Sequence, residues 1–342
     1  MTNTGLDGVV VAETELSGID GELGQLWIAG LRVAELARLG FEDASARLMA
    51  TVGAEWAPKR LGAARVAAFE AMGRWGDALD APDGVAAVRT ALAHASDEPE
   101  ALVATAAVAT AAWVRRRAGM APMAPDASLG HAADLLRMMA GDTREEAVAA
   151  LDRYLCTVID HGLNASTFTA RVVASTAATA SACVVAAAGA LSGPLHGGAP
   201  GPVLDMLDAI GDESRVGAWL EGELDAGRRI MGMGHRVYRV RDPRAPVLLE
   251  ALAPLGEDSR VALARVVEAE AARLLLARKG RPMAANVEMA TALLLEGLGV
   301  PREAFTAVFA CSRIVGWLAH VEEQRRVGRI LRPRARYVGV AA

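Results

Sequence analysis

The sequence predicts an all-α protein. Of its 342 residues, 53% are hydrophobic and only 4% are aromatic, while alanine is abundant, so we expect a core of small side chains on closely packed helices. Helical spacing of apolar residues, broken at short turns that contain glycine or proline, covers most of the chain. The length suffices for two globular domains with a large buried core.

The N-terminal fifty residues carry the only signs of extended structure. Two short pieces, GVVVAE (8–13) and GQLWIAG (24–30), predict a small strand pair. Helical periodicity begins near LRVAELARLGFEDASARLMATV (31–52). It continues over 54–118, with breaks at APDG (81–84) and SDEP (96–99), whose serine and aspartates we expect to cap the next helices.

The middle of the chain reads as amphipathic helices around a proline-containing connection. That connection, RRRAGMAPMAPDASLG (115–130), precedes two predicted helices, HAADLLRMMAG and REEAVAALDRYLCTVID. Residues 172–191 carry no charge, but their alanine, serine and threonine make them weakly hydrophobic, so we predict a buried helix rather than a membrane span. Glycine and proline then gather at 193–202, 227–244 and 279–301, which predicts irregular turns between the later helices.

Charge and cysteine usage exclude several classes of protein. The net charge of −5 gives no general attraction to nucleic acid or to an anionic membrane. Six arginines fall between residues 325 and 336, but few aromatic residues are available to stack on bases, so we expect no nucleic-acid partner. Cys156, Cys183 and Cys311 are far apart in apolar helical surroundings, as for buried thiols, and the N-terminus lacks a signal-peptide pattern. We therefore expect a cytoplasmic protein.

Three of the six histidines stand in unusual local sequences. His161 lies in IDHGLNAST, His196 in GPLHGGAP and His235 in MGMGHRVYRVRDPRAP. Neighbouring glycines let a substrate approach the backbone, which favours a functional role over a packed or solvent-facing one. The sequence has no HExxH, HxH or Cys/His cluster, so no metal is expected.

Arginines accompany these histidines, and a guanidinium can hold a carboxylate through two parallel hydrogen bonds. The C-terminal half carries them after His235, in FACSRIVGW and in RPRARY, as Arg236, Arg239, Arg241, Arg244, Arg313, Arg332 and Arg334. Arginine is therefore the natural clamp for a di- or tricarboxylate, although for most of these arginines helix-surface charge is the better interpretation. Glu288, in ANVEMAT, has neutral neighbours, which leaves two interpretations open: a partly desolvated base, or a first-turn glutamate favoured by the helix dipole.

Five blocks of sequence together resemble the citrate synthase family. They are LNASTFTARVVAST, GPLHGGAP, GHRVYRVRDPRA, NVEMATALLLEGLGVP and FACSRIVGWLAHVEEQ with RPRARYVG, in the family's order over most of 155–340. The resemblance implies a two-domain helical homodimer that condenses acetyl-CoA with oxaloacetate and needs no cofactor besides these substrates. The large domain would comprise 1–195 and 300–342, and the small mobile domain 196–299.

The resemblance also implies roles for single residues. His196 would hydrogen-bond the thioester carbonyl, and His235 would polarise the ketone of oxaloacetate. His161 would bind oxaloacetate as well. The carboxylate-binding arginines would be Arg244, Arg313 and Arg332, the last supplied by the other subunit.

Two positions depart from the family's usual pattern. The proton-abstracting residue is usually aspartate in NVD, whereas this chain has Glu288, which adds one methylene. Gly162 stands where glutamate is common after the histidine.

Arg239, in the loop that carries His235, is the candidate for binding the CoA phosphates.

Two other functions remain open from the sequence. A 2-methylcitrate synthase would use propionyl-CoA through the same residues, because one methyl group changes binding in an apolar pocket by only about 1–3 kcal/mol. A paralogue that binds CoA or a dicarboxylate without turnover would account for Glu288, but it would have no use for the complete set of histidines and arginines.

Overall fold

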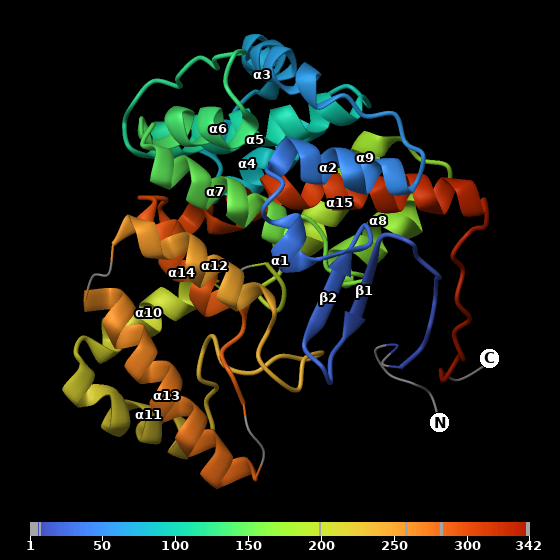
Figure 1. The fold of residues 1–342 in the computed structure, drawn as a ribbon. Helices are drawn as coiled ribbons and strands as arrows, with labels where there is room; N and C mark the ends of the chain where they lie inside the picture. The colour runs from blue at the N-terminus through green and yellow to red at the C-terminus, as the bar shows by residue number, and fades with distance from the viewer. Residues whose placement is uncertain (1–5, 7, 198–199, 257–258, 281–282, 340–342) are drawn as a thin grey trace.

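The computed structural model describes residues 6, 8–197, 200–256, 259–280 and 283–339, and this part of the chain confirms the all-α prediction (Figure 1). Its α-helices are α1 Val33–Leu36, α2 Phe41–Thr51, α3 Leu61–Glu70, α4 Gly84–Leu92, α5 Pro99–Arg117, α6 His131–Ala140, α7 Glu145–Val158, α8 Ala165–Ala174, α9 Ala180–Leu191, α10 Pro200–Ile210, α11 Val216–Asp225, α12 Arg244–Leu252, α13 Ser259–Lys279, α14 Val287–Gly297 and α15 Phe305–Val327.

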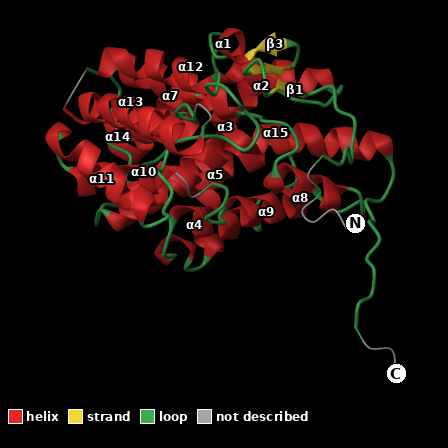
Figure 2. Ribbon diagram, turned by 90° about the horizontal axis from the view of Figure 1, so that it is seen from below, coloured by secondary structure: helices red, strands yellow, loops and turns green. Residues whose placement is uncertain are grey.

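One small antiparallel sheet accompanies the helices, with strand order β1-β2-β3 (Figure 2). The strands are β1 Ser17–Asp20, β2 Gln25–Ile28 and β3 Leu31–Arg32. The strand predicted in 24–30 is thus confirmed as β2, but the strand predicted at 8–13 is wrong. The hairpin turn at 21–24 pairs Ser17 with Ile28, and this register leaves residues 8–13 without a partner strand.

Helix ends follow the sequence in part. Asp83 caps α4 by accepting a hydrogen bond from the backbone N–H of Ala86, as expected. Asp97 does not cap α5: its carboxylate accepts from the N–H of Ser181, at the start of α9. A short carboxylate side chain can accept a hydrogen bond from a free N–H of a neighbouring helix as readily as from one of its own helix.

The uncharged segment 172–191 forms two helices rather than one. α8 ends at Ala174 and α9 begins at Ala180, with Ala177 between them in a left-handed conformation at φ 62°. The two helices pack against each other and against α15. The segment that is long and apolar enough to cross a membrane is instead Arg302–Val327, and 89% of its most apolar window is buried inside the protein, as in a core helix.

α15 is the axis on which the site is built. It packs against α5, α7, α8 and α9 (Figure 1). Its Trp317 is fully buried. α12 packs on α7 and on α14, and α14 contacts α10, so α12 and α14 lie between the α15 body and the helices α10, α11 and α13 (Figure 1). The chain beyond α15 runs as an exposed, extended C-terminal segment away from the helices (Figure 2).

Candidate active site

One cavity of about 950 Å³ collects six of the side chains singled out from the sequence. Its lining includes His161, His196, His235, Arg244, Glu288 and Arg313. They come from five separate places: the turn after α7, the turn after α9, the loop before α12 with that helix's first residue, the start of α14, and the middle of α15. Residues far apart in the sequence therefore meet at one site.

His161 and His235 contact each other, and the ring of Tyr238 contacts both. The rings of His161 and His235 are 5.7 Å apart between centroids, in an edge-to-face arrangement. The hydroxyl of Tyr238 lies 3.0 Å from His161 Nε2, and its ring is 4.7 Å from that of His235. Burial lowers the pKa of His161 well below its usual value, and the neighbouring Arg244 and Arg313 act in the same direction. His161 is therefore a neutral imidazole.

The loop that carries His235 is tied to the start of α14. Gly232 and Gly234 both have positive φ, and a Cβ on Gly234 would lie 2.3 Å from the Met283 methyl carbon. Between them, Met233 forms an isolated antiparallel bridge with Ala285. The two glycines of MGMGH thus serve backbone geometry.

His235 has a defined tautomer. Its Nδ1 accepts hydrogen bonds from the backbone N–H groups of Val237 and Tyr238, at 3.0 and 3.2 Å. A ring nitrogen that accepts carries no proton, so the proton of neutral His235 is on Nε2. Burial, together with Arg244, lowers its pKa to about 4 although Asp242 opposes this. His235 therefore offers a neutral Nε2–H donor.

Glu288 lies in the first turn of α14, as one of the two interpretations requires, and its side chain also lines the cavity. The N-cap residue Asn286 accepts from the Glu288 N–H at 2.9 Å. The Asn286 amide donates to Glu288 Oε2 at 3.3 Å and to the carbonyl of Gly234 at 2.9 Å. Burial raises the pKa of Glu288, against the lowering effects of Asn286 and Arg244. Asn286 thereby fixes this carboxylate relative to the His235 loop.

His196 stands on a tight turn after α9. Its N–H donates to the carbonyl of Gly193, and Gly197 donates to that of Leu191. A Cβ on Gly197 would lie 2.5 Å from the Leu191 oxygen, so only glycine allows the turn to return so close to the helix. His196 Nε2 lies 2.8 Å from the buried hydroxyl of Ser166.

Two buried arginines supply positive charge to the cavity. Arg244 makes two bonds to Asp242, at 3.0 and 2.7 Å, and these outweigh burial and raise its pKa. Arg313 donates through Nε to the carbonyl of Val158 at 2.7 Å and lies 4.6 Å from the centre of the Phe309 ring. Its terminal nitrogen NH2 is buried without a hydrogen-bond partner among the described residues. That nitrogen is a free donor for an anionic ligand.

The N-terminal hairpin braces both histidine loops. Its Gly21 carbonyl accepts from the N–H of Arg239, and a Cβ on Gly21 would lie 2.4 Å from the carbonyl oxygen of Val237. At the other end of β1, Ser17 Oγ accepts from the N–H of Gly162 at 3.0 Å. Gly162 has φ 58°, so glycine suits this position better than glutamate would.

Two expected residues lie outside this cavity. Arg239 is exposed and faces Glu22 of the hairpin, with Nε 3.8 Å from Oε1. Its neighbour Arg236 lines the cavity instead. Arg332 lies in the exposed C-terminal segment and does not line the cavity of its own chain. No local sequence pattern pointed to Ser166, Asn286 or Tyr238, because their roles depend on contacts across the fold.

The chain is similar to known proteins over nearly its whole length. The family model described as citrate synthase, C-terminal domain, matches residues 5–334. A citrate synthase of Haloferax volcanii is 35% identical, over 98% of this chain and 95% of its own length. A 2-methylcitrate synthase of Mycobacterium tuberculosis is 34% identical, over 98% and 90%. The solved ternary complex of carboxymethyl coenzyme A and oxaloacetate with citrate synthase from Thermoplasma acidophilum covers 98% of this chain and 95% of its own, with a TM-score of 0.88 and 26% identity.

Proposed function

The chain belongs to the citrate synthase family, and we propose that it condenses acetyl-CoA with oxaloacetate and water to give citrate and CoA. The observation that carries the proposal is the cavity that is lined together by Glu288, three neutral histidines and two buried arginines. A base, hydrogen-bond donors and an anion clamp are the groups that this condensation needs.

Glu288 removes a proton from the methyl group of acetyl-CoA. A thioester methyl is a very weak acid, so the negative charge that develops on its carbonyl oxygen must be stabilised as the C–H bond breaks. His196 supplies that hydrogen bond. The resulting enolate, held by this hydrogen bond, is the nucleophile.

Oxaloacetate is a dianion, and Arg244 and Arg313 hold its carboxylates. His235 donates its Nε2–H to the ketone oxygen, which makes the carbonyl carbon more electrophilic. The enolate carbon attacks that carbon and forms the new C–C bond, and the alkoxide takes the Nε2 proton of His235. The proton that Glu288 removed from the methyl group replaces the one that His235 gave up, so both residues return to their starting states. Water then attacks the citryl thioester and releases CoA as the thiol.

Two further residues of the cavity lining would contact the substrates. His161 would contact oxaloacetate, and Arg236 would contact the CoA phosphates in place of Arg239, which does not line the cavity.

Propionyl-CoA is the alternative thioester substrate, because one relative at 34% identity is named 2-methylcitrate synthase. Propionyl-CoA would react through the same residues. The test is thiol release with oxaloacetate from acetyl-CoA and from propionyl-CoA at equal enzyme concentration. We expect acetyl-CoA to give the higher kcat/KM. A higher value for propionyl-CoA would move the proposal to 2-methylcitrate synthase, and no release from either thioester would overturn both.

We propose that residues 196–299 move as a small domain against 1–195 and 300–342. Each side supplies part of the cavity, with His161 and Arg313 on one and His235 and Glu288 on the other. Small-angle scattering should therefore show a smaller radius of gyration when oxaloacetate and a CoA analogue are both present. An unchanged radius with both ligands bound would contradict domain closure.

We also propose a cytoplasmic homodimer in which Arg332 reaches the partner's cavity, because the exposed C-terminal segment leaves its own body (Figure 2). Arg332→Gln and Glu288→Gln homodimers should each be nearly inactive. Co-expressed at equal levels, they should recover about 25% of the wild-type activity, since half of the dimers are mixed and each mixed dimer has one intact site. If Arg332 served its own chain, mixing would restore nothing.

A further inference from the structure

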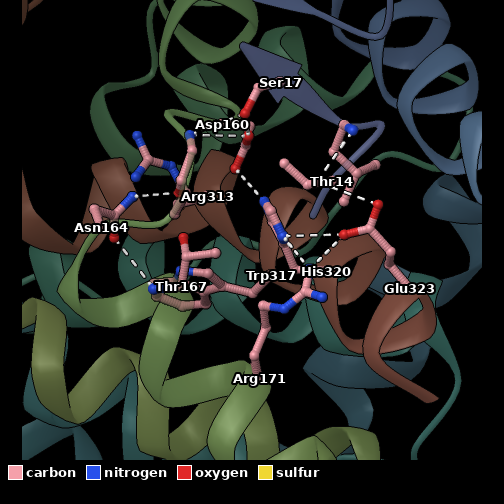
Figure 3. Close-up of polar contacts among 12 residues, drawn as sticks. Thr14, Ser17, Asp160, Asn164, Thr167, Arg171, Arg313, Trp317, His320 and Glu323 are labelled. Carbon is pink, nitrogen blue, oxygen red and sulfur yellow. Dashed lines mark hydrogen bonds and ion pairs between the residues drawn. The ribbon is translucent and has the colours of Figure 1, made fainter. Parts of the chain in front are cut away.

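A buried polar cluster lies behind the turn that carries His161, outside the groups used in the reaction (Figure 3). It consists of Asp160, Arg171, His320 and Glu323, which are all at most 3% exposed. Arg171 and Glu323 form an ion pair. Glu323 also accepts hydrogen bonds from the hydroxyl of Thr14 and from the N–H of Glu15. Burying so many charged groups is costly unless each is paired, so their arrangement calls for an explanation.

One face of α15 holds this turn and the active-site arginine together. Arg313 donates to the carbonyl of Val158, just before the turn. One turn further on, a Cβ on Gly316 would lie 2.3 Å from the carbonyl oxygen of Ile159, so glycine allows α15 to touch the turn's backbone. Another turn on, His320 reaches the side chain of Asp160. The helix that presents Arg313 to the cavity therefore also contacts the residue before His161.

Asp160 is the centre of these contacts. One oxygen, Oδ2, accepts from the hydroxyl of Ser17 at 2.6 Å and from the N–H of Gly162 at 3.2 Å. The other, Oδ1, lies 3.3 Å from His320 Nε2 (Figure 3). Burial alone would raise the pKa of Asp160, but His320, Arg313 and Ser17 together lower it. Asp160 is thus a buried carboxylate directly behind the His161 backbone.

The orientation of the His320 proton follows from its neighbours. His320 Nδ1 lies 3.1 Å from Arg171 NH1, and a guanidinium can only donate, so Nδ1 accepts. The proton is then on Nε2, on the side of Asp160. Neither Nε2 nor Asp160 Oδ1 has an aligned hydrogen bond among the described residues, so the 3.3 Å contact between these two atoms helps to offset the burial of both side chains.

We propose that His320 is a positioning residue of the oxaloacetate site. By its contact with Asp160, His320 holds the turn that places His161. The same contact offsets the negative charge of Asp160, which would otherwise compete with oxaloacetate for Arg313. This inference rests on the proposed function. It assigns no contact between His320 and substrate, so the effect should be confined to the ketoacid.

The test is calorimetric binding of oxaloacetate, together with separate KM values for oxaloacetate and acetyl-CoA. His320→Leu should weaken oxaloacetate binding by about tenfold and raise its KM in parallel, with the KM for acetyl-CoA unchanged. His320→Gln, which returns an N–H donor near the position of Nε2, should restore most of the affinity. Ser17→Ala approaches the same carboxylate from the half-buried hairpin and should weaken binding by about threefold.

Val321→Ala is the matched control, because Val321 is fully buried on the same helix and makes no contact of this kind. It should lower the melting temperature but leave oxaloacetate binding unchanged. Equal binding by His320→Leu, Ser17→Ala and wild type would overturn the inference, and if His320→Leu does not fold, Ser17→Ala and His320→Gln decide it. Failure of the wild type to bind oxaloacetate would instead overturn the proposed function.

Discussion

Glu288→Gln should lower kcat for thiol release from acetyl-CoA by about 10³-fold, because a positioned general base contributes between 10² and 10⁴ to such a step. Glutamine keeps the size of the side chain and can still meet the Asn286 amide, which lies 3.3 Å from Glu288 Oε2. The KM values should change little, since neither substrate relies on this carboxylate for binding. Initial rates with a thiol reagent give both quantities.

Glu288→Asp is the control for the position of the base. It restores the residue usual in the family but withdraws the carboxylate by roughly 1 Å from where this backbone presents it, which should cost about 10²-fold. The loss should thus be smaller than that of Glu288→Gln. Thiol release at wild-type rates by the glutamine variant would show that another group removes the proton.

The pH dependence of the wild type follows from the same carboxylate. Glu288 acts as a base only when ionised, and burial raises its pKa despite the lowering effects of Asn286 and Arg244. The value of kcat should therefore fall as the pH falls through this raised pKa, and the fall should begin at a higher pH than an exposed glutamate would give. A pH–rate profile of the wild type measures it.

Much of this site could be predicted from local sequence. The glycine-flanked positions of His196 and His235 indicated tight turns, and both residues line the cavity. Its neutral neighbours singled out Glu288, and Arg313 was one of several arginines named as carboxylate clamps; both line the cavity. That these residues meet in one cavity was implied only by the family resemblance, because no spacing in the chain relates α9 to α14.

Other features left no local signal. The break at Ala177 uses a left-handed alanine, which sequence patterns do not mark. Asp97 accepts a hydrogen bond from the N–H of Ser181 in the first turn of α9 instead of capping its own helix, and this contact depends on how two distant helices pack. Residues 8–13 have the composition of a strand but no partner, because strand pairing is decided by register with β2.

His196 shares the hydroxyl of Ser166 with two other groups, and the direction of the hydroxyl proton determines which nitrogen of His196 can act. Ser166 Oγ lies 2.8 Å from His196 Nε2, 3.2 Å from Trp317 Nε1 and 2.8 Å from Asn164 Oδ1. The indole can only donate and the amide oxygen can only accept, so the single hydroxyl proton goes either to Asn164 or to His196. When it goes to Nε2, neutral His196 carries its proton on Nδ1, which is the nitrogen left for the thioester oxygen.

His196→Ala should therefore lower kcat by about 10²- to 10³-fold, the usual cost of removing one donor to a developing oxyanion. The matched pair is His196→Asn and His196→Gln, since the asparagine amide nitrogen lies near the position of Nδ1 and the glutamine amide nitrogen near that of Nε2. Asparagine should retain more activity than glutamine, with the KM for oxaloacetate unchanged in both. Burial lowers the pKa of His196 to about 4, so the neutral ring carries a single proton. The reverse order would therefore mean that this proton is on Nε2, and that Ser166 is displaced from Nε2 when the thioester binds.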